Sequence, residues 1–335
     1  LNQLPIITTC YYLIMKSILN IQLYKNRKFV WLISFSLSLI SIIGMLICFK
    51  SPSIKAPLNL GLDYTGGTQI ILERACYNDC IELNTIDIAN SISSLKNIDN
   101  TFISNTSPNL NSSKIQLLDN SKFISIRLPF LSADQSELVI DNVRKSFGPF
   151  VNQNTSVEII GPTLGKQLLK SSLISLFFAF LGIALYINFR YDRRYSLLAL
   201  FALFHDVFIV CGVFSWLGYF YNVEVDTLFA VSLLTIAGYS VNNTVVVFDR
   251  IREKNITENT LSFRYQIDKA VSATLTRTIY TSFTTLLPLI CILIWGGSTL
   301  YWFAFSLIIG VIAGSWSSIA LAPSLLSITS KTELN

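Results

Sequence analysis

A histidine and an aspartate stand side by side in the middle of an apolar stretch of the sequence. His205 and Asp206 lie within Ser196–Leu217, which is otherwise almost entirely apolar. An ionisable group at the centre of a membrane span costs about 2.5–3.5 kcal/mol on insertion scales, so its presence needs a reason. The pair is either functional, as a proton-responsive or helix-bridging pair, or a satisfied structural cluster that stabilises the bundle. The sequence leaves both alternatives open.

Small and amide-bearing residues interrupt a second apolar stretch, Thr227–Phe248. They include Gly238, Ser240, Asn242 and Asn243. Such residues let helices approach closely and form hydrogen bonds across the contact. On a helix, Ser240 and Asn243 lie close to one face, whereas Gly238 and Asn242 do not complete a clean stripe. These residues indicate helix packing and a transport pathway equally well.

Three charged residues lie at the borders of apolar stretches. Asp249 and Arg250 directly follow Thr227–Phe248, and we expect them at the membrane interface. Arg277 directly precedes the stretch Thr278–Trp295. Its long side chain can snorkel to the cytoplasmic surface; if it lies deeper, it requires an acceptor from another helix.

A glycine-rich segment, Gly61-Leu-Asp-Tyr-Thr-Gly-Gly67, precedes a strand-like run. The paired glycines Gly66 and Gly67 permit a positive φ or a close approach of two backbones, and Asp63 can cap the turn. The Lys-Ser/Thr pair and the following helix of a phosphate loop are missing. The segment therefore predicts a tight turn before a strand and not a nucleotide site.

The residue inventory argues against an enzyme. The sequence contains no nucleophile–base pair, and its single histidine excludes a multi-histidine metal site, so we expect neither a metal nor a cofactor. Cys48, Cys211 and Cys291 lie in apolar runs and are expected to be buried packing residues. Cys76 and Cys80 can pair if their domain faces an oxidising space, but two free thiols are the favoured alternative.

Membrane-spanning helices must position these groups. Hydrophobic residues make up 52% of the 335 and charged residues only 13%, whereas soluble domains carry about 25% charged residues. The apolar residues form blocks of about 20, long enough to cross a bilayer as a helix. We predict six spans, at residues 30–49, 168–189, 196–217, 227–248, 278–295 and 300–321.

The region between the first two spans, residues 50–167, is polar and has a different pattern. Thr68–Leu72 and Phe123–Leu128 read as strands, and Thr85–Ser94 and Ala133–Ser146 read as helices opened by capping residues. The predicted fold is a membrane all-α six-helix bundle with one extracytoplasmic α+β domain.

Basic residues set the expected orientation. Clusters at Lys25–Lys28, Arg190–Arg194 and Arg250–Lys254 fall on one side if every block spans. The positive-inside rule then places both termini in the cytoplasm and the polar domain outside. Residues 1–29 form a cytoplasmic segment whose first 14 residues we interpret as a start-site artefact, and residues 322–335 form a cytoplasmic tail. The cytoplasmic loop 249–277 is expected to contain an interfacial helix at Leu261–Val271. The modest net charge of +5 beside apolar blocks does not favour nucleic-acid binding.

Several motifs, taken in order, resemble the SecF family of membrane subunits of the bacterial protein-export machinery. They are GLDYTGGT (Gly61–Thr68), GPTLGKQLL, which opens with Gly161 and Pro162, FRYDRRYS, HDVFIVCGVF, LLTIAGYSVNNTVVVFDRIRE (Leu233–Glu253) and LTRTIYTSFTTLLP. The resemblance covers about Lys25 to Leu326, and the ordered set is far more specific than any single motif.

The resemblance implies a function and partners. SecF proteins work with SecD and the SecYEG channel, and indirectly with SecA and YajC, to draw unfolded secretory polypeptides across the membrane with the proton gradient. Their fold resembles the resistance-nodulation-division transporters. The implied location is a bacterial-type plasma (inner) membrane, with its lipids as surroundings, and a thylakoid or plastid membrane is the alternative.

One position departs from the family pattern. In SecF proteins an aspartate of the fourth span and an arginine of the fifth are linked to proton flow; Arg277 matches the arginine, but Asn243 stands at the aspartate position. An amide forms hydrogen bonds but does not exchange protons in the relevant range. The carboxylate is expected to come from the SecD partner, with Asp206 or weaker proton coupling as alternatives. The competing functions are a small-molecule or lipid exporter subunit of the same superfamily and a non-motor scaffold subunit.

Overall fold

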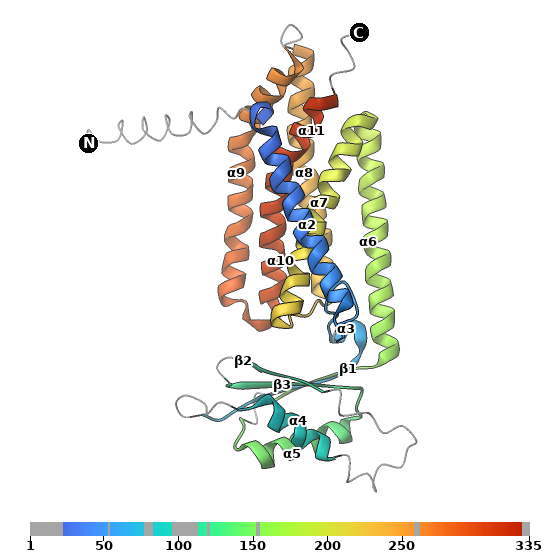
Figure 1. Cartoon of the computed structure of the whole chain (residues 1–335), viewed down its shortest axis with the longest axis vertical. Coiled ribbons are helices and arrows are strands. Elements are labelled where there is room, and N and C mark those ends of the chain that lie inside the picture. The colour runs from blue at the N-terminus through green and yellow to red at the C-terminus, as the bar shows by residue number, and fades with distance from the viewer. Residues whose placement is uncertain are drawn as a thin grey trace, which may run out of the picture. The chain divides into compact units, whose positions relative to one another are not determined.

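The structure is a computed structural model of the chain, shown in Figure 1, and it divides into two compact units. It describes residues 23–52, 54–76, 83–95, 113–118, 121–151, 155–257 and 262–329. One unit is Leu60–Ser172, and the other consists of the chain before Leu60 and after Ser172. Each unit is described by itself below.

Six long apolar helical stretches have the length and composition of membrane spans. Five are single helices: α2 (Leu23–Lys50), α6 (Pro162–Arg190), α7 (Arg193–Tyr221), α8 (Thr227–Thr257) and α9 (Phe263–Trp295). The sixth combines α10 (Gly297–Trp316), the π-helical turn η4 (Ser317–Leu321) and α11 (Ala322–Thr329). This confirms the predicted fold class, a bundle of six apolar helices with a small α+β domain.

The helices extend beyond the apolar blocks, so several expected boundaries differ. Residues 263–271, expected to belong to a separate interfacial helix, form the first turns of α9, and α8 continues to Thr257. The reason is packing, because Ile251 on α8 and Ile267 and Val271 on α9 are buried in the same core as Phe248. Helix α6 begins six residues before the expected span, at Pro162, whose fixed φ suits the first helical position.

The centre of the helical unit is formed by α7, α8 and the sixth span. In the most apolar part of these spans, 50%, 56% and 61% of the residues are buried, against 22% in α2. Serine and glycine residues line the contact between α2 and α7, where a Cβ on Gly212 would lie 2.6 Å from the Cα of Ser41. Such a close approach of backbones is typical of small residues between membrane helices.

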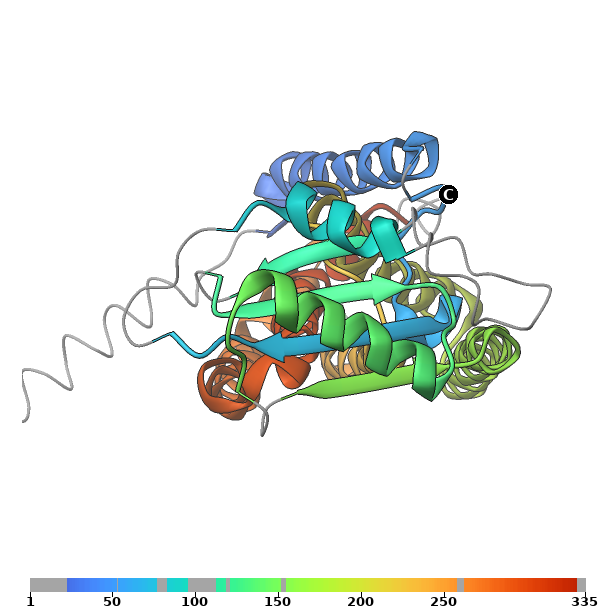
Figure 2. The ribbon, with the colours of Figure 1, turned by 90° about the horizontal axis from the view of Figure 1, so that it is seen from below.

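The Leu60–Ser172 unit contains a four-stranded antiparallel sheet of order β2-β3-β1-β4. Its strands are β1 (Gly67–Glu73), β2 (Lys114–Leu118), β3 (Phe123–Leu128) and β4 (Ser156–Ile160). Helices α4 (Thr85–Ser94) and α5 (Ala133–Phe147) lie on one face of the sheet, as Figure 2 shows. Ile70 pairs with Ile126 across β1 and β3, and both side chains are fully buried beneath the helices.

The expected helices and strands of this unit are found, but the sequence missed β2 and β4. Strand β4 lies at an edge, and four of its five residues are exposed, so it lacks the alternation that identifies a half-buried strand. Cys76 is disulfide-bonded, so the favoured expectation of a free thiol is wrong for this residue. Cys80 lies outside the described residues. Cys48 is buried as expected, but Cys291 is exposed on α9, so its expected burial is wrong.

Candidate functional site

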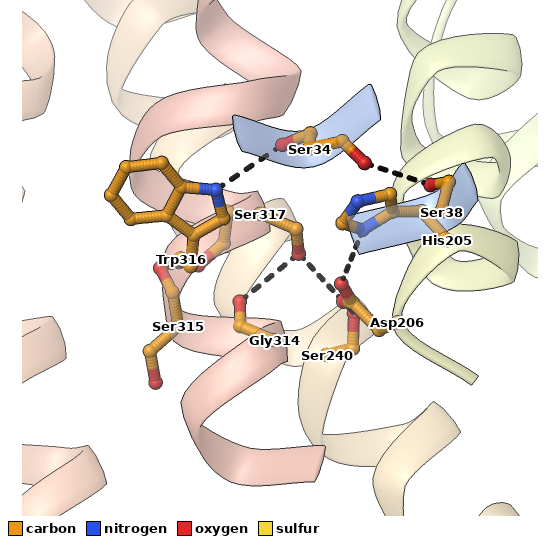
Figure 3. Close-up of polar contacts among 10 residues, drawn as sticks. Ser34, Ser38, His205, Asp206, Ser240, Gly314, Ser315, Trp316 and Ser317 are labelled. Atoms are coloured by element: carbon orange, nitrogen blue, oxygen red, sulfur yellow. Dashed lines mark hydrogen bonds and ion pairs between the residues drawn. The ribbon is translucent and has the colours of Figure 1, made fainter. Parts of the chain in front are cut away.

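Asp206 lies in the middle of α7 at the centre of a buried hydrogen-bond cluster. Its side chain is fully buried. Its Oδ2 accepts hydrogen bonds from Ser240 Oγ on α8 and from Ser317 Oγ in η4, both at 2.6 Å. Its Oδ1 lies 3.1 Å from Nδ1 of the buried His205. Figure 3 shows these side chains converging on the carboxyl group from different helices.

Small residues at the end of α10 make this convergence possible. A Cβ on Gly314 would lie 3.3 Å from Ser240 Cβ and 3.6 Å from Asp206 Oδ2, so a larger residue here would crowd the cluster. The π-helical turn begins at Ser317, where the Ala322 N–H bonds to the Ser317 carbonyl. Single π turns within α-helices occur frequently at functional sites.

Asp206 therefore links α7 to α8 and to η4 through its hydrogen bonds. Ser240, singled out from its residue type, is one of the bridging residues. The polar run Gly314–Ser318 was missed, although small and hydroxyl-bearing residues interrupting an apolar block are the signal that identified Ser240. Proton exchange at the pair stays a prediction.

Asn243 lies one helical turn beyond Ser240 on the same buried face of α8. Asn243 and its neighbour Thr244 are buried, and within the described part of the chain the Asn243 Nδ2 and the Thr244 Oγ1 have no hydrogen-bond partner. Gly238 and Asn242 are exposed on the other side of the helix. The expected placement of Ser240 and Asn243 close to one face of the helix is thus found in the structure.

A tyrosine and two serines fix the register between α8, α9 and α10. Tyr239 Oη donates to Ser282 Oγ at 2.8 Å, and Ser282 Oγ lies 2.7 Å from Ser315 Oγ. Helices α8 and α9 follow each other in the chain, so the Thr257 end of α8 and the Phe263 end of α9 lie on the same side of the bundle. About one helical turn from the Tyr239–Ser282 contact toward these ends lie Asn243 on α8 and Arg277 on α9. The two residues therefore lie at a similar depth.

Arg277 does not open a helix but lies near the middle of α9, and its side chain is exposed. No ion pair to Arg277 occurs among the residues that the structure describes. Two exposed rows of polar and small residues, called the polar rows below, lie near Arg277, one on α9 and one on α8. We define them as Arg277, Thr281 and Thr284 on α9, and Thr235, Gly238 and Asn242 on α8.

Asp249 connects the end of α6 to α8. Arg190 Nη2 pairs with Asp249 Oδ2 at 3.1 Å, and Tyr191 Oη donates to Asp249 Oδ1 at 2.8 Å. Burial, reinforced by this hydrogen bond, raises the pKa of Tyr191 well above its ordinary range. Arg250 pairs with Glu253 one turn further along α8 at 2.6 Å.

The glycine-rich segment forms a single helical turn, α3 (Leu62–Thr65), directly before β1. Gly66 and Gly67 both have positive φ, and a Cβ on Gly66 would lie 2.9 Å from the Cα of Pro162, which follows Gly161 at the start of α6. This confirms a tight turn with a close backbone approach. Asp63 lies inside α3, whose N-cap residue is Gly61, and its role in capping the turn stays a prediction.

Two family models match the chain. The model described as "Protein export membrane protein SecD/SecF, C-terminal" matches residues 139–332, which include α6 to α11. The model described as "SecD/SecF GG Motif" matches residues 54–74, which include the paired glycines. The matches thus cover both the membrane cluster and the turn before β1.

Curated relatives align with nearly the whole chain. The protein translocase subunit SecF of Prochlorococcus marinus is 55% identical over 91% of this chain and 94% of the relative. The protein of the same name from Synechocystis is 38% identical over 92% of this chain and 93% of the relative.

Solved structures of SecDF share the fold. The crystal structure of SecDF from Thermus thermophilus matches with a TM-score of 0.74 and 24% identity, over 92% of this chain and 38% of that chain. SecDF in the super-membrane-facing form matches with a TM-score of 0.59 and 26% identity, over 93% of this chain and 39% of that chain. The chain thus spans well under half of the length of these solved proteins.

Proposed function

The chain belongs to the SecD/SecF family of protein-export membrane proteins, and we propose that it works with a SecD partner and the SecYEG channel to promote export. Its substrates are unfolded secretory polypeptides, and its energy comes from the proton-motive force across a bacterial-type plasma membrane. The movement of one charge through 100 mV is worth about 2.3 kcal/mol, so proton movement can do this work without covalent chemistry.

The observation that carries the proposal is the exposed position of Arg277. A guanidinium at the lipid-facing surface of an apolar span is costly unless a carboxylate or other acceptor meets it. The side chain lies at the depth of Asn243, which carries an amide where the family resemblance implies an aspartate. A SecD partner that covers the exposed polar rows and supplies a carboxylate to Arg277 would satisfy this charge and complete the membrane site.

The proposed orientation places the sheet unit outside and the ends of the chain in the cytoplasm. Arg190, Arg193 and Arg194 lie at the joint of α6 and α7, and Arg252 and Lys254 lie near the end of α8. Lysine and arginine collect on the cytoplasmic side of membrane proteins. In this orientation the sheet unit meets the polypeptide as it leaves the channel.

Arg277→Ala tests this function. Cells depleted of the native protein and supplied with the variant should accumulate pulse-labelled precursor of a secreted protein, while the variant inserts at the normal level. Arg252→Ala is the matched control, because Arg252 is an exposed arginine at the end of α8, away from the polar rows. Normal precursor processing in the Arg277 variant would refute the scheme. Normal processing after depletion, with altered efflux of small apolar compounds, would indicate an exporter.

A non-motor scaffold is the second candidate, and the amide of Asn243 favours it. Asn243→Asp restores the acid that family members have at this position. A gain in the dependence of export on the proton gradient, measured with and without an uncoupler in vesicles, would support the motor. An export rate that is equally sensitive to the uncoupler in both proteins would support the scaffold.

A further inference from the structure

We propose that Asp206 is a proton-binding site of this chain, separate from Arg277, and that its proton sets the hydrogen bonding between Ser317 and the Gly314 carbonyl. The binding site is inferred from contacts within the bundle. Its role in export rests on the function proposed above.

The charge of the pair requires an exchangeable proton. A carboxylate at Asp206 beside a neutral His205 would leave one uncompensated negative charge in the centre of the bundle, which is strongly unfavourable. One added proton makes the pair neutral, on either the carboxyl or the imidazole. An imidazolium would carry a second N–H at Nε2, but His205 Nε2 is buried and, among the described residues, has no hydrogen-bond partner. The geometry therefore favours the proton on Asp206.

The surrounding hydroxyl groups can satisfy the carboxyl group in both protonation states. Without the proton, Ser240 and Ser317 both donate to Asp206 Oδ2 at 2.6 Å. With the proton on Oδ2, the carboxyl group donates to Ser317 Oγ, and the Ser317 hydroxyl turns to the Gly314 carbonyl oxygen, which lies 3.2 Å away. Ser240 keeps donating to Oδ2 in both states. The two arrangements differ by one proton and by the direction of one hydroxyl group.

This change is transmitted to the junction of α10 and η4. Gly314 lies in the last turn of α10 and Ser317 is the first residue of the π-helical turn. Proton release turns the Ser317 hydroxyl from the Gly314 carbonyl to Asp206 Oδ2, and proton binding turns it back. The contact between Ser317 and Asp206 is kept in both states. The site thus couples the charge on α7 to the local structure of the sixth span.

A proton fits the site better than a metal cation. Serine oxygens 2.6 Å from the carboxylate oxygen are in direct hydrogen-bond contact. A cation with oxygen ligands at about 2.0–2.6 Å would need to hold these oxygens further apart.

The elements packed against Asp206 present no compensating charge at its level. On α7 itself the neighbouring titratable group is His205, with Cys211 more than one turn away. On α8 the nearest are Tyr239, which bonds to Ser282, and Asp249, which is nine residues beyond Ser240. The charged residues of α2 lie at its ends and are Lys25, Arg27, Lys28 and Lys50; α2 also carries the titratable Cys48. Helix α10, η4 and α11 contain no charged residue, and the titratable group on α10 is Tyr301.

Infrared difference spectroscopy on the full chain in phospholipid vesicles tests the site. Acidification of the vesicle suspension should produce the carbonyl-stretch band of a protonated carboxyl group, and this band should shift in heavy water. Asp206→Asn should abolish this band. Ser317→Ala should shift the midpoint of its titration, whereas Ser306→Ala, a buried serine of α10 that bonds to its own helix, should leave it unchanged.

The outcomes separate the site from the proposed function. The proposal is wrong if Asp206→Asn leaves the pH-dependent carbonyl-stretch band in place, or if the band that this variant removes does not change with pH. If that variant fails to insert, an unchanged midpoint in Ser317→Ala relative to Ser306→Ala overturns it. A titrating band together with normal export in Arg277→Ala would leave the proton site standing and refute the proposed function.

Discussion

Gly212→Ala should weaken the packing between α2 and α7 that holds Asp206 in place. The added Cβ would overlap Ser41 Oγ and lie 2.6 Å from Ser41 Cα, and the second of these atoms belongs to the backbone and cannot rotate away. To restore a carbon–carbon separation of about 3.5 Å, the helices must separate locally by roughly 1 Å. Overpacking costs about 1–3 kcal/mol, and alanine returns about 0.5–1 kcal/mol of helix propensity. We expect a net loss of up to about 2.5 kcal/mol in the free energy of unfolding, centred on about 1 kcal/mol.

The measurement is reversible unfolding of the full chain in mixed micelles with increasing denaturing detergent. Gly182→Ala is the matched control, because nothing lies within 4 Å of the Cβ it would add on α6, and it should be neutral or stabilising. Ser41→Gly removes the Oγ and Cβ atoms that the new methyl group would meet but leaves the backbone of α2 in its way, so it should rescue Gly212→Ala only in part. Equal stability of the Gly212 and Gly182 variants would refute the packing argument.

Gly67→Ala should destabilise the sheet unit, because φ is +132° and the added Cβ would lie 2.6 Å from the Leu128 carbonyl oxygen. Gly148 also has a positive φ, but a Cβ added there would lie in open space, so Gly148→Ala is the control. Thermal unfolding followed by circular dichroism should show a smaller loss of stability for Gly148→Ala than for Gly67→Ala. Equal losses in the two variants would contradict the steric effect. Burial and the Asp249 hydrogen bond raise the pKa of Tyr191, so the folded state keeps a proton that the unfolded state releases above about pH 10. The contribution of Tyr191 to the free energy of unfolding is fully present below about pH 10 and decreases as the pH rises. Tyr191→Phe should remove the part of the alkaline loss of stability that comes from this residue. An unchanged dependence of the free energy of unfolding on pH would count against this prediction.

The six spans and most of the sheet unit could be predicted because their signals are local. Long apolar blocks identify spans without knowledge of their partners. In Phe123–Leu128 a buried hydrophobic residue stands at every second position, namely Ile124, Ile126 and Leu128, and Ser132 and Gln135 form a capping box before α5. The family resemblance, which rests on ordered motifs, is confirmed by the matching family models and relatives.

The membrane cluster could be predicted only in part. The cost of ionisable groups in lipid identified His205 and Asp206, and a hydroxyl group in an apolar helix identified Ser240. Ser317 lies 111 residues from Asp206, and its approach depends on a π-helical turn that leaves no periodic signal in the sequence. The ends of α8 and α9 were missed for a related reason, because tertiary packing extends both helices past the apolar blocks.

The polar groups of the bundle divide between two tasks. Asp206 is fully buried and bonded to α8 and η4, so a partner chain cannot reach it without opening the bundle. Arg277 is exposed on α9, where a partner can meet it. Helix α8 connects the two regions, because it carries Ser240 on its buried face and Asn242 on its exposed face.

The hydrogen bond of Tyr239 with Ser282 limits how far α8 can move to relay a change at Asp206. The two oxygen atoms lie 2.8 Å apart, and a slide of α8 along α9 by one residue, about 1.5 Å, would exceed the range of a good hydrogen bond. Ser315 Oγ lies 3.4 Å from Tyr239 Oη, within reach of a small rotation. Tyr239 Oη therefore lies within reach of hydroxyl groups on both α9 and α10, and its hydrogen bond can pass from one to the other without a slide of α8.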